Sequence, residues 1–386
     1  MTRVSSLGRI EGTLSPWAQT SARSRGRRHP EAEHAYRSVY QRDRDRIVHS
    51  KAFRRLKHKT QVFIAPEGDH YRTRLTHTLE TCGIARTVAR ALGLNEDFVE
   101  SLALSHDLGH TPFGHLGEDV LDGFMRAHGG FDHNRQTLRI VERLEERYPA
   151  FPGLNLSWEV REGIAKHSGP IDTARAPEFA EYEPGLQPPL EAQLIDLVDE
   201  IAYNHHDLDD GFASGILDVE ALAASVPLFG EPLQRARARF AGADPRALRT
   251  VALRGLIDTL VTDLIESTVS RIESSGAGSV DEVRAAGEPL AGLSDPVGAE
   301  NLALKRYLRE HLYEHHRIER MKDKAARVLH ALFERYLENP RLLPDDPRRK
   351  IASDGVHRAI ADYIAGMTDR YATEEYQRLF DPTIRV

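Results

Sequence analysis

The sequence has almost no cysteine and no long apolar segment. Cys82 is the only cysteine in 386 residues, so an internal disulfide and a cysteine-rich zinc site are both excluded, which agrees with a reducing compartment. No run approaches the roughly 18 consecutive apolar residues that a membrane-spanning helix requires. The first 30 residues are polar and arginine-rich and lack the apolar core of a signal peptide. We therefore expect a cytoplasmic protein that does not bind membranes.

An overall excess of positive charge is also missing. The formal net charge is −7 at pH 7, so the surface as a whole lacks the positive charge typical of nucleic-acid-binding proteins. We predict that residues 1–34 form a flexible basic arm. Residues 35–63 are also dense in basic side chains, among them Arg42, Arg44, Arg46, Arg54, Arg55, Lys57 and Lys59. This second segment is either a solvated face or a cationic wall that meets phosphate, because arginine guanidinium groups match phosphate oxygens.

Helical periodicity recurs along most of the chain, and no segment shows strand alternation or an internal repeat. The predicted helices cover 76–92, 95–107, 120–128, 133–148, 158–167, 190–207, 219–225, 229–240, 245–273, 299–313, 316–337 and 355–380. Residues 274–298 and 338–348 are expected to be loops. The length allows one large domain or two smaller ones. We predict an all-α fold with a core at 35–215 and a helical C-terminal part at 216–386, which completes the active site and an oligomer interface.

The most unusual stretch is SHDLGHTPFGHLGE (105–118), which follows an apolar helix. Gly109 can end this helix, and Pro112 favours an extended backbone in the residue before it. Five side chains in the stretch can bind a metal ion or transfer a proton: His106, Asp107, His110, His115 and Glu118. The first two are expected near a helix end and the others after it. A polar surface turn is the alternative, but the preceding helix is too apolar to lie on the surface.

Four residues are candidate metal ligands: His77, His106, Asp107 and Asp199. They come from three predicted helices, as in helical bundles that build metal sites in their cores. Asp199 lies opposite the apolar face of helix 190–207, but Asp196 lies beside it, and angular position alone does not choose between them. Two imidazoles and two carboxylates suit Mn²⁺, Fe²⁺, Mg²⁺, Co²⁺ or Zn²⁺. Such an ion polarises a phosphoryl oxygen and lowers the pKa of a bound water.

Four residues are candidates for proton transfer. His115 and Glu118 are three residues apart, so the carboxylate can orient the imidazole. His110 and His133 are further candidates in the same setting. A single histidine is more often a hydrogen-bonded structural residue, and it is the clustering of these residues that favours chemistry.

These residues resemble the HD-domain metal-dependent phosphohydrolases, and within them the deoxyguanosine triphosphate triphosphohydrolase-like branch of the dNTP triphosphohydrolases. The most specific matches are HDLGHTPFGHLGE (106–118) and DEIAYNHHDLDDG (199–211). Matching segments span nearly the whole chain in family order: 42–63, 73–80, 103–118, 131–142, 153–167, 191–211 and 361–372. The resemblance implies an HD-domain helical bundle with a helical C-terminal extension.

The resemblance also implies roles for individual residues. The metal ligands are His77, His106, Asp107 and Asp199, with Asp199 preferred over Asp196. The catalytic histidine is His115, oriented by Glu118, with His110 and His133 close by. The substrate-binding residues are Arg74 for phosphate and Gln61, Tyr203 and Asp207 for the deoxyribose. Asn134 is a departure, since some relatives carry an acid there, and it leaves a proton-relay role for His133 open.

The reaction that the resemblance implies is hydrolysis of a dNTP to deoxynucleoside and inorganic tripolyphosphate by attack of water at the α-phosphorus. The branch is usually homo-oligomeric and often hexameric. The sequence leaves open the base preference, the native metal, a dNTP effector and modulation by single-stranded DNA. One alternative is another HD-type phosphohydrolase, a 5′-nucleotidase or a guanosine tetraphosphate hydrolase. A second is a non-catalytic nucleic-acid-binding regulator that uses the basic arm and residues 42–59.

Overall fold

All regular structure in the described part of the chain is helical. The computed structural model describes residues 11–61, 71–167, 169, 171, 173–174 and 177–385. Within these residues, extended backbone pairs only in isolated bridges such as that between Arg27 and Ser157. The all-α prediction is confirmed.

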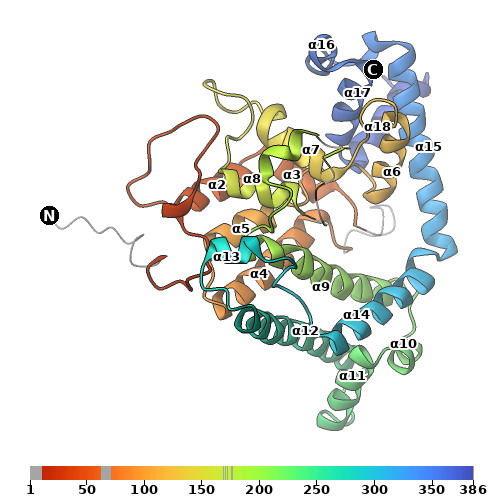
Figure 1. Ribbon diagram of the computed structural model, residues 1–386. Helices are drawn as coiled ribbons and strands as arrows, with labels where there is room; N and C mark the ends of the chain where they lie inside the picture. The colour runs from red at the N-terminus through yellow and green to blue at the C-terminus, as the bar shows by residue number, and fades with distance from the viewer. Residues whose placement is uncertain are drawn as a thin grey trace.

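The core of the molecule is built around three helices: α4 (Arg74–Ala91), α5 (Glu96–Ser105) and α9 (Leu190–Ala213). Each of them packs against the other two, and α12 (Pro245–Ser275) covers α4 and α9 from outside (Figure 1). Their buried faces carry large apolar side chains such as Phe98 and Leu194, which are almost inaccessible to solvent. Burial of these faces is the main stabilising contribution, and it fixes how α4 and α9 face each other.

The remaining helices surround this core. On the N-terminal side they are α2 (Val39–Val48), α3 (Lys51–Arg55), α6 (His115–Met125), α7 (His133–Arg139) and α8 (Trp158–Ala165). On the C-terminal side they are α10 (Val219–Ser225), α11 (Pro227–Arg239), α13 (Val280–Ala285), α14 (Asp295–Leu308), α15 (His316–Glu338), α16 (Asp345–Asp354), α17 (Val356–Ala365) and α18 (Asp369–Phe380). Short 3₁₀ or π turns extend several of them, including η4 (Ile140–Leu144) and η6 (Arg309–Tyr313).

A second apolar cluster joins α6 to the C-terminal helices. Leu121 and Met125 of α6 are fully buried and belong to the same cluster as Leu332 and Phe333 of α15 and Ile360 of α17. Figure 1 shows α6 beside α15, α17 and α18, although more than 190 residues separate α6 from α15 in sequence. The helix that begins at His115 is therefore held by the C-terminal part of the chain.

Most predicted helices are present, and the differences fall at weakly apolar segments. Helix α16 begins inside the predicted 338–348 loop and continues to Asp354. Helix α13 lies inside the predicted 274–298 loop. Both helices are short and carry few apolar residues, so their periodicity is weak. The predicted helix 355–380 is interrupted between α17 and α18, because the Thr368 side chain caps α18 by accepting a hydrogen bond from the Tyr371 amide.

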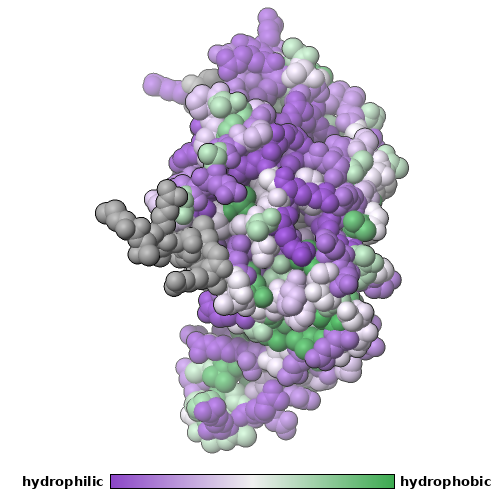
Figure 2. Space-filling view, turned by 60° about the vertical axis from the view of Figure 1, so that its left-hand side comes forward, coloured by the Kyte–Doolittle hydropathy of each residue, from purple (hydrophilic) through white to green (hydrophobic). Residues whose placement is uncertain are grey.

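Polar side chains dominate the face of the molecule shown in Figure 2, and apolar ones gather towards its lower end. Among the helices that the structure describes, none combines the length and hydropathy needed to cross a bilayer. Even α12, with 31 residues, carries charged residues such as Asp258, Asp263 and Glu266 along its length.

Part of the segment predicted to be a flexible basic arm contacts the core. Residues 1–10 lie outside the described residues. The Arg27 side chain is only 4% exposed, pairs with Asp43 and donates to the backbone oxygen of Asn155 at 2.6 Å. The Glu191 carboxylate accepts a hydrogen bond from the Gln19 amide at 2.9 Å. The arginine content of this segment suggested a solvated arm. Amino-acid composition does not show which residues of the core, such as Asp43 and Glu191, will bind it.

Replacement of Glu191 by glutamine is expected to change how stability depends on pH. Burial raises the pKa of Glu191 to about 7, so between about pH 4.5 and 7 the folded protein holds a proton that the unfolded chain releases. The resulting stabilisation is complete below about pH 4.5 and is lost as the pH rises through about 7. The glutamine variant should therefore gain stability relative to the wild type by up to about 1.4 kcal/mol per pH unit in this window. Urea unfolding across the window measures this, and a pH-independent difference would contradict it.

Candidate active site

A cavity of about 780 Å³ lies between α4, α9, the segment 106–114 and the C-terminal helices α14 and α15. Nine of the predicted site residues line it: Gln61, Arg74, His77, Asp107, His110, His115, His133, Asp199 and Tyr203. The other three, His106, Glu118 and Asp207, lie behind this lining and contact it. The structure therefore brings all twelve predicted site residues to one place.

The four candidate metal ligands converge at the floor of this cavity. Asp199 Oδ1 lies 2.8 Å from His77 Nε2 and 3.5 Å from His106 Nε2. The Asp107 carboxylate lies 3.5 Å from His106 Nε2 and 3.8 Å from His77 Nε2. Three of the side chains are almost fully buried, and Asp199 is half-buried. His77, His106 and Asp107 offer ligand atoms within 4.8 Å of one another, a group that could hold a divalent metal ion, and Asp199 lies beside two of them as a fourth ligand.

The buried polar atoms at this floor fit a cation. His106 Nε2 and Asp107 Oδ2 have no hydrogen-bond partner in the described part of the chain, which is costly unless a cation binds them. His106 Nδ1 donates to the Ala103 carbonyl at 2.7 Å, so the lone pair of Nε2 faces the cavity. Burial raises the pKa of Asp107, but Arg74, 3.1 Å away, together with His106 and His110 outweighs burial and holds the pKa well below its usual range.

His206 orients His77 from outside the ligand set, and the sequence analysis missed it. His77 Nδ1 and His206 Nε2 are 2.9 Å apart and share one hydrogen bond. If His77 Nδ1 donates this bond, the lone pair of His77 Nε2 faces the cavity. Neutral His206 then accepts at Nε2 and carries its proton on Nδ1, which lies 2.9 Å from Asp207 Oδ1. The DEIAYNHHDLDDG segment contains His206, but nothing in its spacing separates it from its neighbour His205.

The structure distinguishes Asp199 from Asp196. Asp199 faces the two imidazoles of the candidate metal site, whereas Asp196 pairs with the imidazole of His167. His167 lines the same cavity and was not predicted as a site residue. The two carboxylates lie nearly one helical turn apart on α9, so only the packing of α4 against α9 decides which one meets His77.

A second group of side chains surrounds Glu118. Glu118 Oε2 lies 3.5 Å from His115 Nδ1, and both carboxylate oxygens lie 3.0 Å from His133 Nδ1. The His110 and His133 rings are 4.1 Å apart between centroids. Burial alone raises the pKa of Glu118, but hydrogen bonds from His115 and His133 outweigh it and hold the pKa far below its usual range. Glu118 is thus an anion that orients two imidazoles, and the His115 side chain, 66% exposed, faces the cavity.

The turn before His115 requires a glycine. Phe113 and Gly114 both have φ near +63°, in the left-handed region. A Cβ on Gly114 would lie 3.1 Å from Arg74 Nη2, so a larger residue would also displace the arginine. The Thr111 hydroxyl donates to the Gly114 carbonyl at 2.8 Å and closes the turn. This geometry makes His115 the first residue of α6.

Asp369 and Lys59 hold this turn from outside the cavity. Asp369 accepts a hydrogen bond from the Phe113 amide at 2.9 Å and another from the Thr60 amide at 2.8 Å. Lys59 Nζ donates to the carbonyl of Ala365 at 2.9 Å and also to that of His110. Asp369 comes from the MTDRY segment of α18, where the sequence analysis assigned no role. Both residues position the histidines without lining the cavity.

Replacement of Asp369 by alanine is expected to destabilise the fold and to displace His115. The change leaves the buried amides of Phe113 and Thr60 without partners, and each unsatisfied group costs about 1–3 kcal/mol. Urea unfolding measures the loss. Asp345→Ala is the matched control, since that carboxylate is 81% exposed and its ion pair among the described residues is the exposed one with Arg348. Equal stability of the two variants would contradict the positioning role.

Two tyrosines form the side wall near Asp207. The Tyr313 hydroxyl donates to Asp207 Oδ2 at 2.6 Å, and the rings of Tyr203 and Tyr313 are 6.1 Å apart. Burial raises the pKa of Asp207 to about 7, although the Tyr313 hydrogen bond opposes this. Gln61 Nε2 is buried without a partner among the described residues and is free to donate to a ligand. Tyr313 was not predicted as a site residue.

The C-terminal helices give the cavity a cationic wall. Four basic residues line it: Lys305, Arg306, Arg309 and Lys322. Lys305 is paired with Glu200 at 2.7 Å, and Lys322 donates to the backbone oxygen of Tyr313 at 2.9 Å. None was predicted individually, because a basic residue on an amphipathic helix usually indicates only a solvated face. Together with Arg74 they make the cavity suitable for a polyanion.

Comparison with known proteins agrees with this geometry. A model of the HD domain matches residues 74–204, and a model of the phosphohydrolase-associated domain matches residues 291–378. The first match contains the four candidate metal ligands, and the second contains the cationic wall and Tyr313.

Full-length relatives are also highly similar. A deoxyguanosinetriphosphate triphosphohydrolase-like protein from Geobacter sulfurreducens is 50% identical over 374 residues, which are 97% of this chain and 96% of the relative. Proteins of the same description from Ralstonia nicotianae and Azoarcus sp. are 50% and 51% identical over 372 and 368 residues. These matches cover 96% and 95% of this chain and 95% and 96% of the two relatives. The chain therefore belongs to the deoxyguanosinetriphosphate triphosphohydrolase-like family of HD-domain phosphohydrolases.

Proposed function

We propose that the protein hydrolyses deoxynucleoside triphosphates to deoxynucleoside and inorganic tripolyphosphate. The observation that carries the proposal is the position of His115, which faces the same cavity as the four converging ligands and the cationic wall. The names of the relatives support the same substrate class. A divalent ion held by His77, His106, Asp107 and Asp199 would polarise the α-phosphoryl oxygen and lower the pKa of a bound water.

The side chains of the cavity provide the other requirements of the reaction. Arg74 and the cationic wall neutralise the triphosphate, since arginine and lysine donate charge-assisted hydrogen bonds to phosphate oxygens. Water attacks the α-phosphorus while the bond to the 5′-oxygen breaks. His115 donates a proton to the departing 5′-oxygen, and the Glu118 carboxylate stabilises the protonated imidazole before this step.

The tyrosine wall fits recognition of the sugar. Tyr203 and Tyr313 line the cavity, and Asp207 holds the Tyr313 hydroxyl. A tyrosine ring packed against C2′ leaves no room for a 2′-hydroxyl, which favours deoxyribose over ribose. Gln61 can donate its unpaired amide hydrogen to the 3′-hydroxyl.

The test is incubation of metal-loaded protein with each dNTP, singly and in mixtures, with products identified by ion-exchange chromatography. We expect tripolyphosphate and deoxynucleoside. Orthophosphate from a nucleoside monophosphate would favour a 5′-nucleotidase instead, and cleavage at the β–γ bond would contradict the proposed reaction. Hydrolysis that occurs only in mixtures would indicate that a dNTP also acts as an effector.

A further inference from the structure

A second cavity, of about 490 Å³, lies behind the turn that carries the catalytic histidines. It is bounded by α3, α7, η4 and the C-terminal helices α16, α17 and α18. No residue lines both cavities, but Leu108 lines this one while its neighbour Asp107 lines the active site. The segment that contains His106 and Asp107 therefore separates the two cavities.

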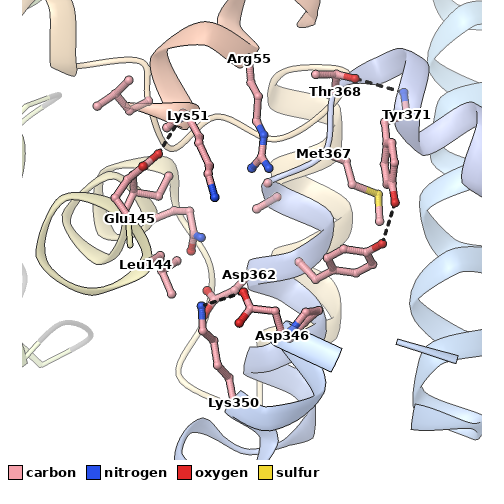
Figure 3. A pocket seen from close by; sticks show the side chains of 18 of the residues that line it. Lys51, Arg55, Leu144, Glu145, Asp346, Lys350, Asp362, Met367, Thr368 and Tyr371 are labelled. Atoms are coloured by element: carbon pink, nitrogen blue, oxygen red, sulfur yellow. Dashed lines mark hydrogen bonds and ion pairs between the residues drawn. The ribbon is translucent and has the colours of Figure 1, made fainter. Parts of the chain in front are cut away.

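Basic side chains point into this second cavity from two opposite sides. Figure 3 shows Lys51 and Arg55 reaching in from α3 and Lys350 from α16. Within the described residues, the structure gives Lys51 and Arg55 no hydrogen bond and no ion pair. Lys350 is only loosely paired, with Nζ 3.5 Å from Glu146 and 3.7 Å from Asp346. Lys51 and Arg55 thus face the cavity without a directly paired anion among the described residues, and Lys51 acts on the Asp346 carboxylate only at longer range.

Two of the three acidic residues of the lining are already paired with arginines from outside the cavity, and the third, Glu145, bonds to a backbone amide. Glu145 Oε1 accepts from the Ala52 amide at 2.7 Å. Asp362 accepts from Arg139 Nε at 3.1 Å, and Asp346 accepts from Arg349 Nη2 at 2.9 Å. Arg139 and Arg349 do not line the cavity, so these pairs are complete without Lys51 or Arg55.

The rest of the wall is polar on one side and apolar on the other. The hydroxyls of Tyr363 and Tyr371 lie 3.1 Å apart and line the cavity, so a ligand can bond to either hydroxyl oxygen. Figure 3 shows the Tyr371 side chain in this wall. Leu144 and Ile140 line the opposite part. The cavity can therefore hold a small molecule that carries anionic groups on part of its surface.

We propose that this second cavity binds a small molecule through its phosphate groups, which lie between Lys51, Arg55 and Lys350. A planar guanidinium and two flexible ammonium groups form the donor set that suits phosphate oxygens. Because the cations come from both sides, a ligand with several phosphates fits better than a single orthophosphate. Inorganic polyphosphate and the phosphate tail of a nucleotide share this chemistry.

The position of the site couples it to the catalytic turn. Lys59 lines the second cavity, and its Nζ donates to the carbonyl of His110 on the active-site side. Gln136 also lines the second cavity, from the helix that begins at His133. A bound ligand would contact the residues that hold His110 and His133. Any effect on turnover rests on the proposed function, whereas binding does not.

Isothermal titration of the full-length protein tests the proposal. The probes are inorganic tripolyphosphate, ATP and unphosphorylated adenosine. The variants are Lys51→Ala/Arg55→Ala and the matched control Arg54→Ala/Lys57→Ala, which removes the same charge from exposed residues outside the cavity. If the active site also binds polyphosphate, as the proposed function requires, the wild type and the control show two sites per chain, and otherwise they show one.

The expected result is that Lys51→Ala/Arg55→Ala binds tripolyphosphate at the second cavity at least about tenfold more weakly than the wild type does. The control variant should bind it there with the affinity of the wild type. Equal affinities for tripolyphosphate and ATP would identify free polyphosphate as sufficient, and tighter ATP binding would identify a nucleotide. Three outcomes would overturn the proposal. They are unchanged tripolyphosphate binding by Lys51→Ala/Arg55→Ala, an equal loss of tripolyphosphate binding in the control variant, and binding of adenosine but not tripolyphosphate in the second cavity. Loss of hydrolysis with both binding sites intact would instead count against the proposed function.

Discussion

Replacing Asp199 by alanine is expected to abolish tight metal binding and to lower hydrolysis by about 10³-fold or more, because the metal contributes several kcal/mol of transition-state stabilisation. The change removes one of the four converging ligands. In the wild type, Asp199 Oδ1 lies 2.8 Å from His77 Nε2. The Asp199 side chain is 29% exposed, so its truncation leaves no deep cavity in the core. Metal content is measured by mass spectrometry of the purified variant, and fold by circular dichroism.

Asp196→Ala is the matched control for this experiment. Asp196 lies on the same helix and lines the same cavity, but it pairs with His167 and not with His77 or His106. This variant should keep its metal ion. Normal metal content in Asp199→Ala, or an equal loss of metal in Asp196→Ala, would contradict the assignment of the ligands.

Replacing His115 by alanine is expected to lower kcat by about 10²–10⁴-fold, the usual contribution of a general acid or base. Metal content and stability should be unchanged, since the His115 side chain is 66% exposed and its contacts with Glu118 and with the rings of His110 and His133 lie at the cavity. Steady-state rates with saturating metal measure the effect, and urea unfolding verifies the fold. His49→Ala, at an exposed histidine outside the cavity, is the control and should retain full activity. A metal-loaded His115→Ala protein of normal activity would exclude His115 as the proton donor.

Sequence alone could predict the residues whose setting is local. The end of α5 after Ser105 places His106 and Asp107 side by side at the floor of the cavity, and that helix end followed from Gly109 and the apolar run before it. The His115–Glu118 spacing likewise follows from a single helical turn. In each case a few neighbouring residues determine the geometry.

Residues placed by tertiary packing could not be found in this way. Asp369 binds the Phe113 amide across 256 residues, and Tyr313 binds Asp207 across 106. Neither pair leaves a trace in periodicity or spacing. The choice between Asp196 and Asp199 depends on how α4 packs against α9, so helical angles alone left it open, and only the family resemblance favoured Asp199.

The most direct test of the mechanism is hydrolysis of a dNTP in water enriched in ¹⁸O. If His115 and the four-residue ligand site act on the α-phosphorus, the bond to the 5′-oxygen breaks. The labelled oxygen must then appear in tripolyphosphate, with none in the deoxynucleoside. Label in the 5′-hydroxyl of the deoxynucleoside, or in orthophosphate or pyrophosphate released directly from the dNTP, would contradict the mechanism.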